Sequence, residues 1–344
     1  MKRASGSGDA VSIRMVAEAA GVSAATVSNA LNGKPSVSPH IARRVREAAE
    51  ALGYAADNHA SRLRSGKRAL AGVVVPDLSN PMFGAFVSTL ERAARRDGLD
   101  LLVVSSANDP AEEAERLRAL RSWRPSGLIV IPCDGGLAGR LPPGAMPPIV
   151  VADRIPDAPA FDLVAVDNAA SAGAMVSHLA ANGFRSGLVA GTSLAISNVR
   201  ERWEGALAAA GPLALTMLEC GLAAAGIRET LLARLARGPR PDVLFSLDHV
   251  TSLLAFRALA ELGLRIGRDI GFASFDETEW MRLVTPPITA VCQPVEQLAE
   301  AAWRRLALRM DGDDGSSTVT RFACALQFRG STLRLPGRPD TEAA

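Results

Sequence analysis

The chain has 344 residues, 48% of them apolar and 22% charged, which predicts two or three compact domains. No apolar run approaches the roughly 18–20 residues that span a bilayer. Residues 1–11 lack the apolar core of a signal peptide, so we expect a cytoplasmic protein rather than a membrane or exported one. The four cysteines lie far apart beside apolar residues, which predicts buried, reduced thiols and no metal or cofactor. They are Cys133, Cys220, Cys292 and Cys324.

The net charge of +2 conceals an asymmetry along the chain. Residues 1–70 hold three lysines and eight arginines against five acidic side chains, a net charge of +6, whereas the rest of the chain carries −4. A small basic segment on a mildly acidic body predicts a polyanion partner for that segment alone.

Apolar residues at helical spacing predict three short helices near the N-terminus, over about residues 13–20, 24–31 and 39–52. Each follows a residue that can cap a helix, namely Ser12, Ser23 and Ser38.

The first two of these helices have the features of a helix-turn-helix unit. Ala17 permits a close crossing, Gly21 suits the tight turn, and Val27 plugs the space between the helices. The exposed N-terminal side of the second helix is where such a unit meets base edges. We expect DNA contacts from Ser23, Ala24, Ala25, Thr26, Ser28, Asn29 and Asn32. The alternative, a three-helix bundle with a structural role, does not explain the basic excess.

The stretch from Val16 to Asn32, VAEAAGVSAATVSNALN, resembles the signature of the LacI/GalR family of bacterial regulators. The likeness continues through Val37-Ser38 and Leu52-Gly53-Tyr54. It implies an all-α headpiece of the lambda-repressor type over residues 12–56, acting at the nucleoid. Asn29 stands where the family usually has a base-reading arginine, and because Asn prefers adenine whereas Arg prefers guanine, we expect a different operator at that position.

Residues 57–69 are polar, basic and too short to fold alone, which by itself fits a flexible linker. The resemblance implies instead a hinge helix that orders when two copies pack over the minor groove. Leu63 would then be the wedge between central base pairs, Ala60 the contact between the two hinges, and Arg64 a further DNA contact.

From Leu70 onward, short β-rich runs alternate with helical segments, and the alternation restarts after residue 186. This pattern predicts two doubly wound lobes with parallel sheets, in which ligands bind beyond the carboxyl ends of the strands. The expected strands are 71–75, 100–104, 127–131, 149–152 and 163–166, then 187–190, 213–218, 242–247, 270–274 and 288–291. The clearest helices are 81–97 and 110–123.

No glycine-rich phosphate loop follows the first of these strands, which argues against a dinucleotide enzyme. The body resembles the family's effector domain, an α/β fold of the periplasmic-binding-protein type I. The resemblance implies that the chain crosses between lobes three times, near Asp167, near Gln293 and around residues 318–328. The expected division is lobe 1 at about 70–166 and 294–318, lobe 2 at about 168–292 and 328–336, with disordered ends at 1–11 and 337–344.

Six residues of the body are the expected effector contacts. Arg202 and Asp276 align with the family's ligand-gripping arginine and hydroxyl-binding carboxylate, although a solvated helix charge and a helix cap are the alternative interpretations. Phe83 would form an apolar wall, and Trp280 lies close enough to Asp276 to stack on a ring, unless it packs in the core. The set is Phe83, Asp153, Arg202, Asp248, Asp276 and Trp280.

Dimerisation is implied by the resemblance, since two heads must reach half-sites about one helical turn apart. We expect a homodimer or tetramer whose operator affinity depends on a sugar-like effector, with pentose, hexose, sugar acid and nucleoside all open. A periplasmic solute-binding protein would share the body fold but not the basic head. An enzyme using Asp276 and Glu277 is disfavoured because adjacent residues after a strand point apart and no partner base is evident.

Overall fold

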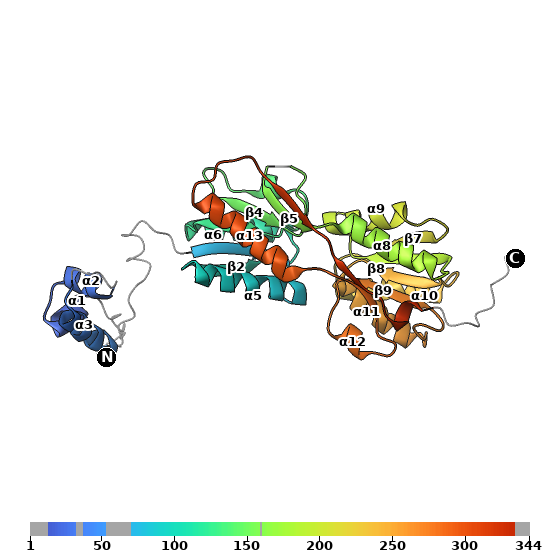
Figure 1. Ribbon diagram of the computed structural model, residues 1–344, viewed down its shortest axis with the longest axis horizontal. Helices are drawn as coiled ribbons and strands as arrows, with labels where there is room; N and C mark the ends of the chain where they lie inside the picture. Colours follow the sequence, from blue (N-terminus) through green and yellow to red (C-terminus); the bar gives the residue numbers. More distant parts are fainter. Residues whose placement is uncertain (1–12, 32–36, 53–69, 159, 334–344) are drawn as a thin grey trace, which may run out of the picture. The chain divides into compact units, whose positions relative to one another are not determined.

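The computed structural model describes residues 13–31, 37–52, 70–158 and 160–333, and it divides into two compact units at Arg68 (Figure 1). Within these ranges, no helix combines the length and apolar character that crossing a bilayer requires. The predicted hinge residues, the two chain ends and Asn32 lie outside the described residues.

The N-terminal unit contains helices α1 (Ile13–Ala20), α2 (Ala24–Leu31) and α3 (Pro39–Ala51) around a small apolar core. Val16, Val27 and Val45 are completely buried there. Gly21 adopts φ +61° in the turn between α1 and α2, a conformation that glycine reaches without strain. Ser23 caps α2 by accepting a hydrogen bond from the Thr26 amide at 3.1 Å. The helix-turn-helix headpiece is therefore confirmed as a fold.

The second unit begins with a parallel sheet that forms lobe 1 (Figure 1). Its strand order is β2 (Asp100–Ser105), β1 (Leu70–Val75), β3 (Gly127–Val130), β4 (Ile149–Ala152), β5 (Asp162–Val166) and β11 (Val319–Phe322). Alternate strand residues face two separate cores. One core packs under α5 (Pro81–Arg96) and α13 (Val295–Met310), and the other under α6 (Pro110–Ser122) and α7 (Leu137–Arg140).

Lobe 2 repeats this strand order in a second sheet. The order is β7 (Ala214–Glu219), β6 (Ser186–Gly191), β8 (Val243–Ser246), β9 (Gly271–Phe275), β10 (Thr289–Cys292) and the antiparallel β12 (Ala325–Gln327). Helices α8 (Asn168–Ala181) and α9 (Ser197–Ala208) cover one face. The other is covered by α10 (Ala224–Ala236), α11 (His249–Glu261) and α12 (Trp280–Leu283), and η1 (Gly330–Thr332) follows β12.

The chain passes between the lobes after β5, before α13, and between β11 and β12, where Figure 1 shows the last strands running from one sheet to the next. Lobe 1 extends to Phe322 rather than residue 318, because β11 pairs with β5. The alternation of strands and helices predicts the doubly wound core correctly. It does not identify β11 and β12, which are short and largely exposed.

Candidate functional site

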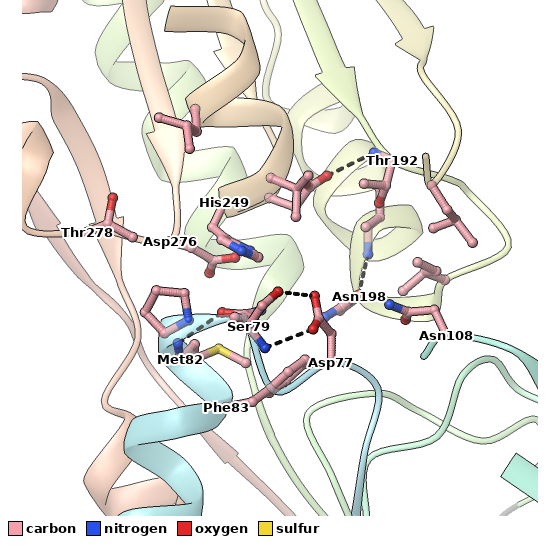
Figure 2. A pocket seen from close by; sticks show the side chains of 18 of the residues that line it. Asp77, Ser79, Met82, Phe83, Asn108, Thr192, Asn198, His249, Asp276 and Thr278 are labelled. Atoms are coloured by element: carbon pink, nitrogen blue, oxygen red, sulfur yellow. Dashed lines mark hydrogen bonds between the residues drawn. The ribbon is translucent and has the colours of Figure 1, made fainter. Parts of the chain in front are cut away.

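A cavity of about 540 Å³ lies between the two lobes, at the carboxyl ends of their strands. Lobe 1 contributes the loop after β1, the start of α5 and the residues after β4. Lobe 2 contributes α9, the start of α11 and the loop after β9. Figure 2 shows Ser79 and Met82 on one side of the cavity and His249 and Asp276 on the other. Such a crevice is where doubly wound proteins bind ligands.

Arg202, on α9, is one of three described arginines that line this cavity and is only 1% exposed. Its Nε donates to Oδ1 of Asn168 at 2.8 Å, and Nη1 donates to the Leu247 carbonyl at 2.7 Å and to Asp276 at 3.4 Å. The guanidinium carbon lies 3.7 Å from the centre of the Phe275 ring. Among the described residues Nη2 has no hydrogen-bond partner. Arg202 is thus not a solvated helix charge, and it keeps a donor free for a ligand.

Asp276 follows β9 directly and adopts φ +71°. It accepts hydrogen bonds from Arg202 and from Nε2 of Gln293, which lies on the second crossing. The next helix, α12, has Glu279 at its N-cap position, so Asp276 is not the cap of that helix. The neighbouring Glu277 points elsewhere and pairs with Arg282 and Arg329, so the two carboxylates do not act as a pair.

Asp153 follows β4 and is 4% exposed, with φ +61°. Its Oδ2 accepts from Nδ2 of Asn198 across the lobes at 3.0 Å, whereas Oδ1 has no partner within the described part of the chain. Burial raises the pKa of the Asp153 carboxyl, and the nearby Arg202 and Arg154 oppose that rise. Asp153 is therefore a buried acceptor with one oxygen still to be satisfied.

Further polar atoms lining the same cavity are buried without a partner among the described residues. Besides Arg202 Nη2 and Asp153 Oδ1, they are Asn108 Oδ1, Arg154 Nε, Thr278 Oγ1 and Gln293 Oε1. An unsatisfied buried polar atom costs roughly 1–3 kcal/mol, so a cluster of them around one cavity indicates a site built for a polar molecule. Donors and acceptors are both present, as hydroxyl groups require.

The other three predicted effector residues also line the cavity, with different environments. Asp248 caps α11 and accepts hydrogen bonds from the amides of Thr251 and Thr192, both at 2.8 Å. Its carboxylate is therefore engaged in holding the loop. Phe83 belongs mainly to the lobe 1 core, and the Trp280 ring packs on Phe256 with centroids 4.9 Å apart. Phe83 is thus almost completely buried, whereas Trp280 keeps part of its surface exposed.

Residues that the sequence analysis did not select complete the cavity. Asn198 and Thr278 lie beside selected residues, and Asn108 follows β2. Gln293 was named only as a crossing point between the lobes, and Arg154 and His249 each follow a selected residue directly in the sequence. Their common signal is a polar side chain shortly after a buried strand or near a helix start, which sequence shows only once the strand ends are known.

The predicted DNA-contacting residues of the head lie on the first two turns of α2 and its cap. Ser23 and Ala25 are exposed, and the others are partly buried: Ala24, Thr26, Ser28 and Asn29. Arg43, Arg44 and Arg46 are exposed on α3. The predicted contacts Asn32, Ala60, Leu63 and Arg64 lie outside the described residues. Among the residues that are described, no group of three His, Cys, Asp or Glu side chains is arranged to hold a metal.

Comparison with known proteins matches both units. Residues 12–57 match the family described as bacterial regulatory proteins, lacI family, and residues 176–332 match the periplasmic binding protein-like domain. The HTH-type transcriptional regulator PtxS of Pseudomonas putida is 33% identical over 328 residues, covering 94% of this chain and 96% of that protein. The HTH-type transcriptional regulator KdgR of Bacillus subtilis is 30% identical over 332 residues, covering 93% and 97%.

Solved structures share the fold. The Lac repressor dimer bound to operator and the anti-inducer ONPF superposes with a TM-score of 0.80 at 24% identity, over 94% of this chain and 99% of that one. A LacI family transcriptional regulator from Enterococcus faecium with bound ribose superposes with a TM-score of 0.66 at 20% identity, over 77% and 99%.

Proposed function

The chain belongs to the LacI family of bacterial regulatory proteins, and we propose that it is a repressor that binds a palindromic DNA operator as a dimer under the control of a polyhydroxylated metabolite. The observation that carries the effector part is the set of buried, unpartnered polar atoms around the interlobe cavity. The N-terminal unit supports the DNA-binding part of the proposal, since α2 presents a small, polar N-terminal surface and α3 has exposed arginines.

On DNA, α2 of each head enters a major groove, with Asn29 reading a base edge and Ala24 and Ala25 contacting thymine methyl groups. The segment 57–69 of each copy packs over the minor groove, where Leu63 wedges between base pairs and Arg64 contacts the DNA. Because the heads of one dimer are related by a two-fold axis, the operator is palindromic.

In the cavity, Arg202 donates from Nη2 to an oxygen of the effector, and Asp276 and Asp153 accept from its hydroxyl groups. Asp248 holds the surrounding loop by capping α11 rather than contacting the effector directly. A nucleoside is disfavoured because Phe83 is committed to the lobe 1 core, which leaves Trp280, already packed on Phe256, as the one partly exposed Phe, Tyr or Trp among the described lining residues. A sugar or a sugar acid fits the unpartnered donors and acceptors of the cavity best.

We further propose that the protein catalyses no reaction and acts on the nucleoid in the cytoplasm. The carboxylates at the site support this, since Asp276 is hydrogen bonded to Arg202 and Glu277 faces away to its own arginines. A pair of catalytic carboxylates would need to face one substrate.

Selection of bound fragments from the host genome by the full-length protein tests the DNA part. We expect a palindromic consensus whose affinity falls about tenfold or more for Asn29→Ala, which removes one bidentate base contact worth roughly 1–3 kcal/mol. Glu47→Ala on α3 is the control and should not weaken binding. Recovery of no common sequence would refute the proposal.

Thermal shift of the full chain against a panel of pentoses, hexoses, aldonic acids and nucleosides tests the effector part. A bound compound raises the Tm, because it stabilises only the folded state. The same compound should alter operator affinity by about 5–150-fold, the usual range of allosteric coupling. A compound that raises the Tm but leaves DNA affinity unchanged would contradict control by the cavity.

A further inference from the structure

Helix α9 lines the cavity and also contacts the opposite lobe through its side chains. Arg202 faces the cavity from its second turn. Earlier on the same helix, the Ser197 hydroxyl accepts from the Ile155 amide of lobe 1 at 2.7 Å, and Asn198 donates to Asp153 at 3.0 Å. The helix therefore reaches across the cleft at its N-terminal end.

A second bridge lies one turn further along. Glu201 of α9 forms a bidentate ion pair with Arg321 of β11, with Nη1 to Oε2 at 3.1 Å and Nη2 to Oε1 at 2.8 Å. Strand β11 is part of the lobe 1 sheet, so this pair crosses from one lobe to the other. Arg321 Nη1 also lies 3.4 Å from the Val166 carbonyl at the end of β5. The pair thus sits where the chain itself crosses between lobes.

Asn168 connects this bridge to the cavity. The side chain is completely buried at the start of α8, and its Oδ1 accepts from Nε of Arg202 at 2.8 Å. Its Nδ2 donates to Oε2 of Glu201 at 3.0 Å. A continuous set of hydrogen bonds therefore runs from the cavity to lobe 1, through Arg202, Asn168, Glu201 and Arg321.

The helix is also held rigidly on its own lobe. A Cβ on Gly205 would lie 2.1 Å from the backbone oxygen of Ala169, so α9 packs directly against the backbone of α8. Gly173 on α8 meets the Gly205 carbonyl in the same way, where a Cβ would lie at 3.1 Å. Because neither helix can move closer, a shift of Arg202 moves the contacts with lobe 1 instead of being absorbed by repacking.

We propose that α9 is the strut that sets the angle between the lobes, and that Glu201 and Arg321 are the positioning residues that anchor it on lobe 1. Its regulatory meaning rests on the proposed function, in which occupancy of the cavity changes operator affinity. Through the hydrogen bonds from Arg202 to Arg321, an effector bound to Arg202 can change the angle between the lobes even without contacting lobe 1 itself.

Hydrogen–deuterium exchange of the full chain, without DNA or any effector, tests the strut. The Ile155 amide is bonded across the cleft to Ser197, so its exchange reports opening of the lobes. We expect exchange over residues 153–157 to rise by about threefold or more in Glu201→Ala and in Arg321→Ala. The double variant should exchange no faster than Glu201→Ala, because that substitution already removes both the ion pair with Arg321 and the hydrogen bond from Asn168.

Glu261→Ala is the matched control. Glu261 forms an equally bidentate pair with Arg228, at 3.0 and 2.6 Å, but both residues lie in lobe 2, so exchange over residues 153–157 should not change. Arg321→Lys keeps one charge contact and should restore most of the protection, which separates the lost ion pair from a folding defect.

The variant Arg202→Gln tests the end of the hydrogen-bond chain that lies at the cavity, because it removes the guanidinium that donates to Asn168. Exchange over residues 153–157 should rise here too, whereas Arg200→Ala, on the exposed side of α9, should leave it unchanged. Faster exchange confined to the neighbourhood of each substitution would overturn the proposal. Since no DNA or effector is used, that outcome would leave the proposed function standing, and failure to find an operator would not affect this result.

Discussion

The two lobes have the same strand order but different chemistry at equivalent positions. The fourth strand of each sheet is β4 in lobe 1 and β9 in lobe 2. Each is followed directly by an aspartate that lines the cavity, Asp153 after β4 and Asp276 after β9. Both adopt a left-handed backbone, at φ +61° and +71°. Asp is among the few residues other than glycine that enter this region readily.

The partners of the two aspartates differ. Asp276 is bonded to Arg202 of its own lobe, whereas Asp153 accepts a hydrogen bond from the neutral Asn198 of the opposite lobe. Burial therefore raises the pKa of Asp153. One topology thus places a carboxylate at the same point twice, and the residue of α9 that lies beside it decides whether it pairs with a charged group or with a neutral one.

The lobes differ in the same way where the C-terminal segment returns to each sheet. At the start of β5, Asp162 accepts hydrogen bonds from Arg309 of α13 and from Thr318, and it forms an ion pair with Arg305 of α13. At the start of β10, Thr289 has only neutral partners, including Ser331 and the Arg329 carbonyl. Charged side chains thus hold this part of lobe 1 together, whereas neutral hydroxyl groups hold the corresponding part of lobe 2.

The largest effect should come from the buried arginines. We expect Arg202→Ala to weaken effector affinity by about 100-fold or more, because truncating one partner of a buried charged hydrogen bond costs roughly 2–5 kcal/mol. Arg154→Ala in lobe 1 should weaken it by about tenfold or less, since Arg154 mainly donates to the carbonyls of Pro132 and Cys133. Titration calorimetry with the compound found by thermal shift measures both, and Arg200→Ala is the control. Equal losses of effector affinity in both arginine variants would show that the two lobes contribute equally to effector binding.

Asp162→Ala should lower the free energy of unfolding by about 3 kcal/mol near pH 7, since it leaves Arg309 without its carboxylate and Arg305 with Asp313 alone. Its arginine partners and Thr318 lower the pKa of Asp162 from 3.8 to about 2. The contribution is therefore complete above pH 3.8 and is lost as the pH falls toward 2.

Thr289→Val in lobe 2 is the matched substitution. It removes neutral hydrogen bonds and should cost about 1–2 kcal/mol at every pH. Urea unfolding from neutral to acidic pH distinguishes the two. A penalty for Asp162→Ala that does not diminish in acid would mean that the ion pairs do not hold the lobe 1 segment.

The smallest effect should come from Asp153→Asn, which keeps an acceptor for Asn198 but removes the buried charge. We expect a Tm higher by a few degrees at pH 8. Because the folded pKa of Asp153 is raised, its cost is present above that pKa and disappears below the ordinary value of 3.8, so the gain should shrink on acidification. Asp276→Asn should instead lower the Tm at pH 8, since it leaves Arg202 without an anion. A gain for Asp153→Asn that is equal at all pH values would assign it to packing.

The sequence determined the elements of this protein. Helical and alternating apolar patterns, with caps such as Ser23 and the turn at Gly21, specify the head helices and the core strands, because these depend on neighbouring residues alone. Strand ends followed by polar residues also indicate Asp153 and Asp276 as candidates for the site. The short strands β11 and β12 escaped prediction because their pairing partners, β5 and β10, are distant along the chain.

Only the tertiary structure decided how the site residues are used. Arg202, Asn168 and Arg321 are far apart in sequence, and their connection depends on the packing of α9 on α8 and of β11 on β5. Whether a carboxylate is paired, capping a helix or left with an open oxygen likewise follows from which side chains and amides the packing brings beside it, as Asp276, Asp248 and Asp153 illustrate. The local sequence pattern determines where along the chain a polar side chain follows a strand, and long-range packing determines which groups that side chain contacts.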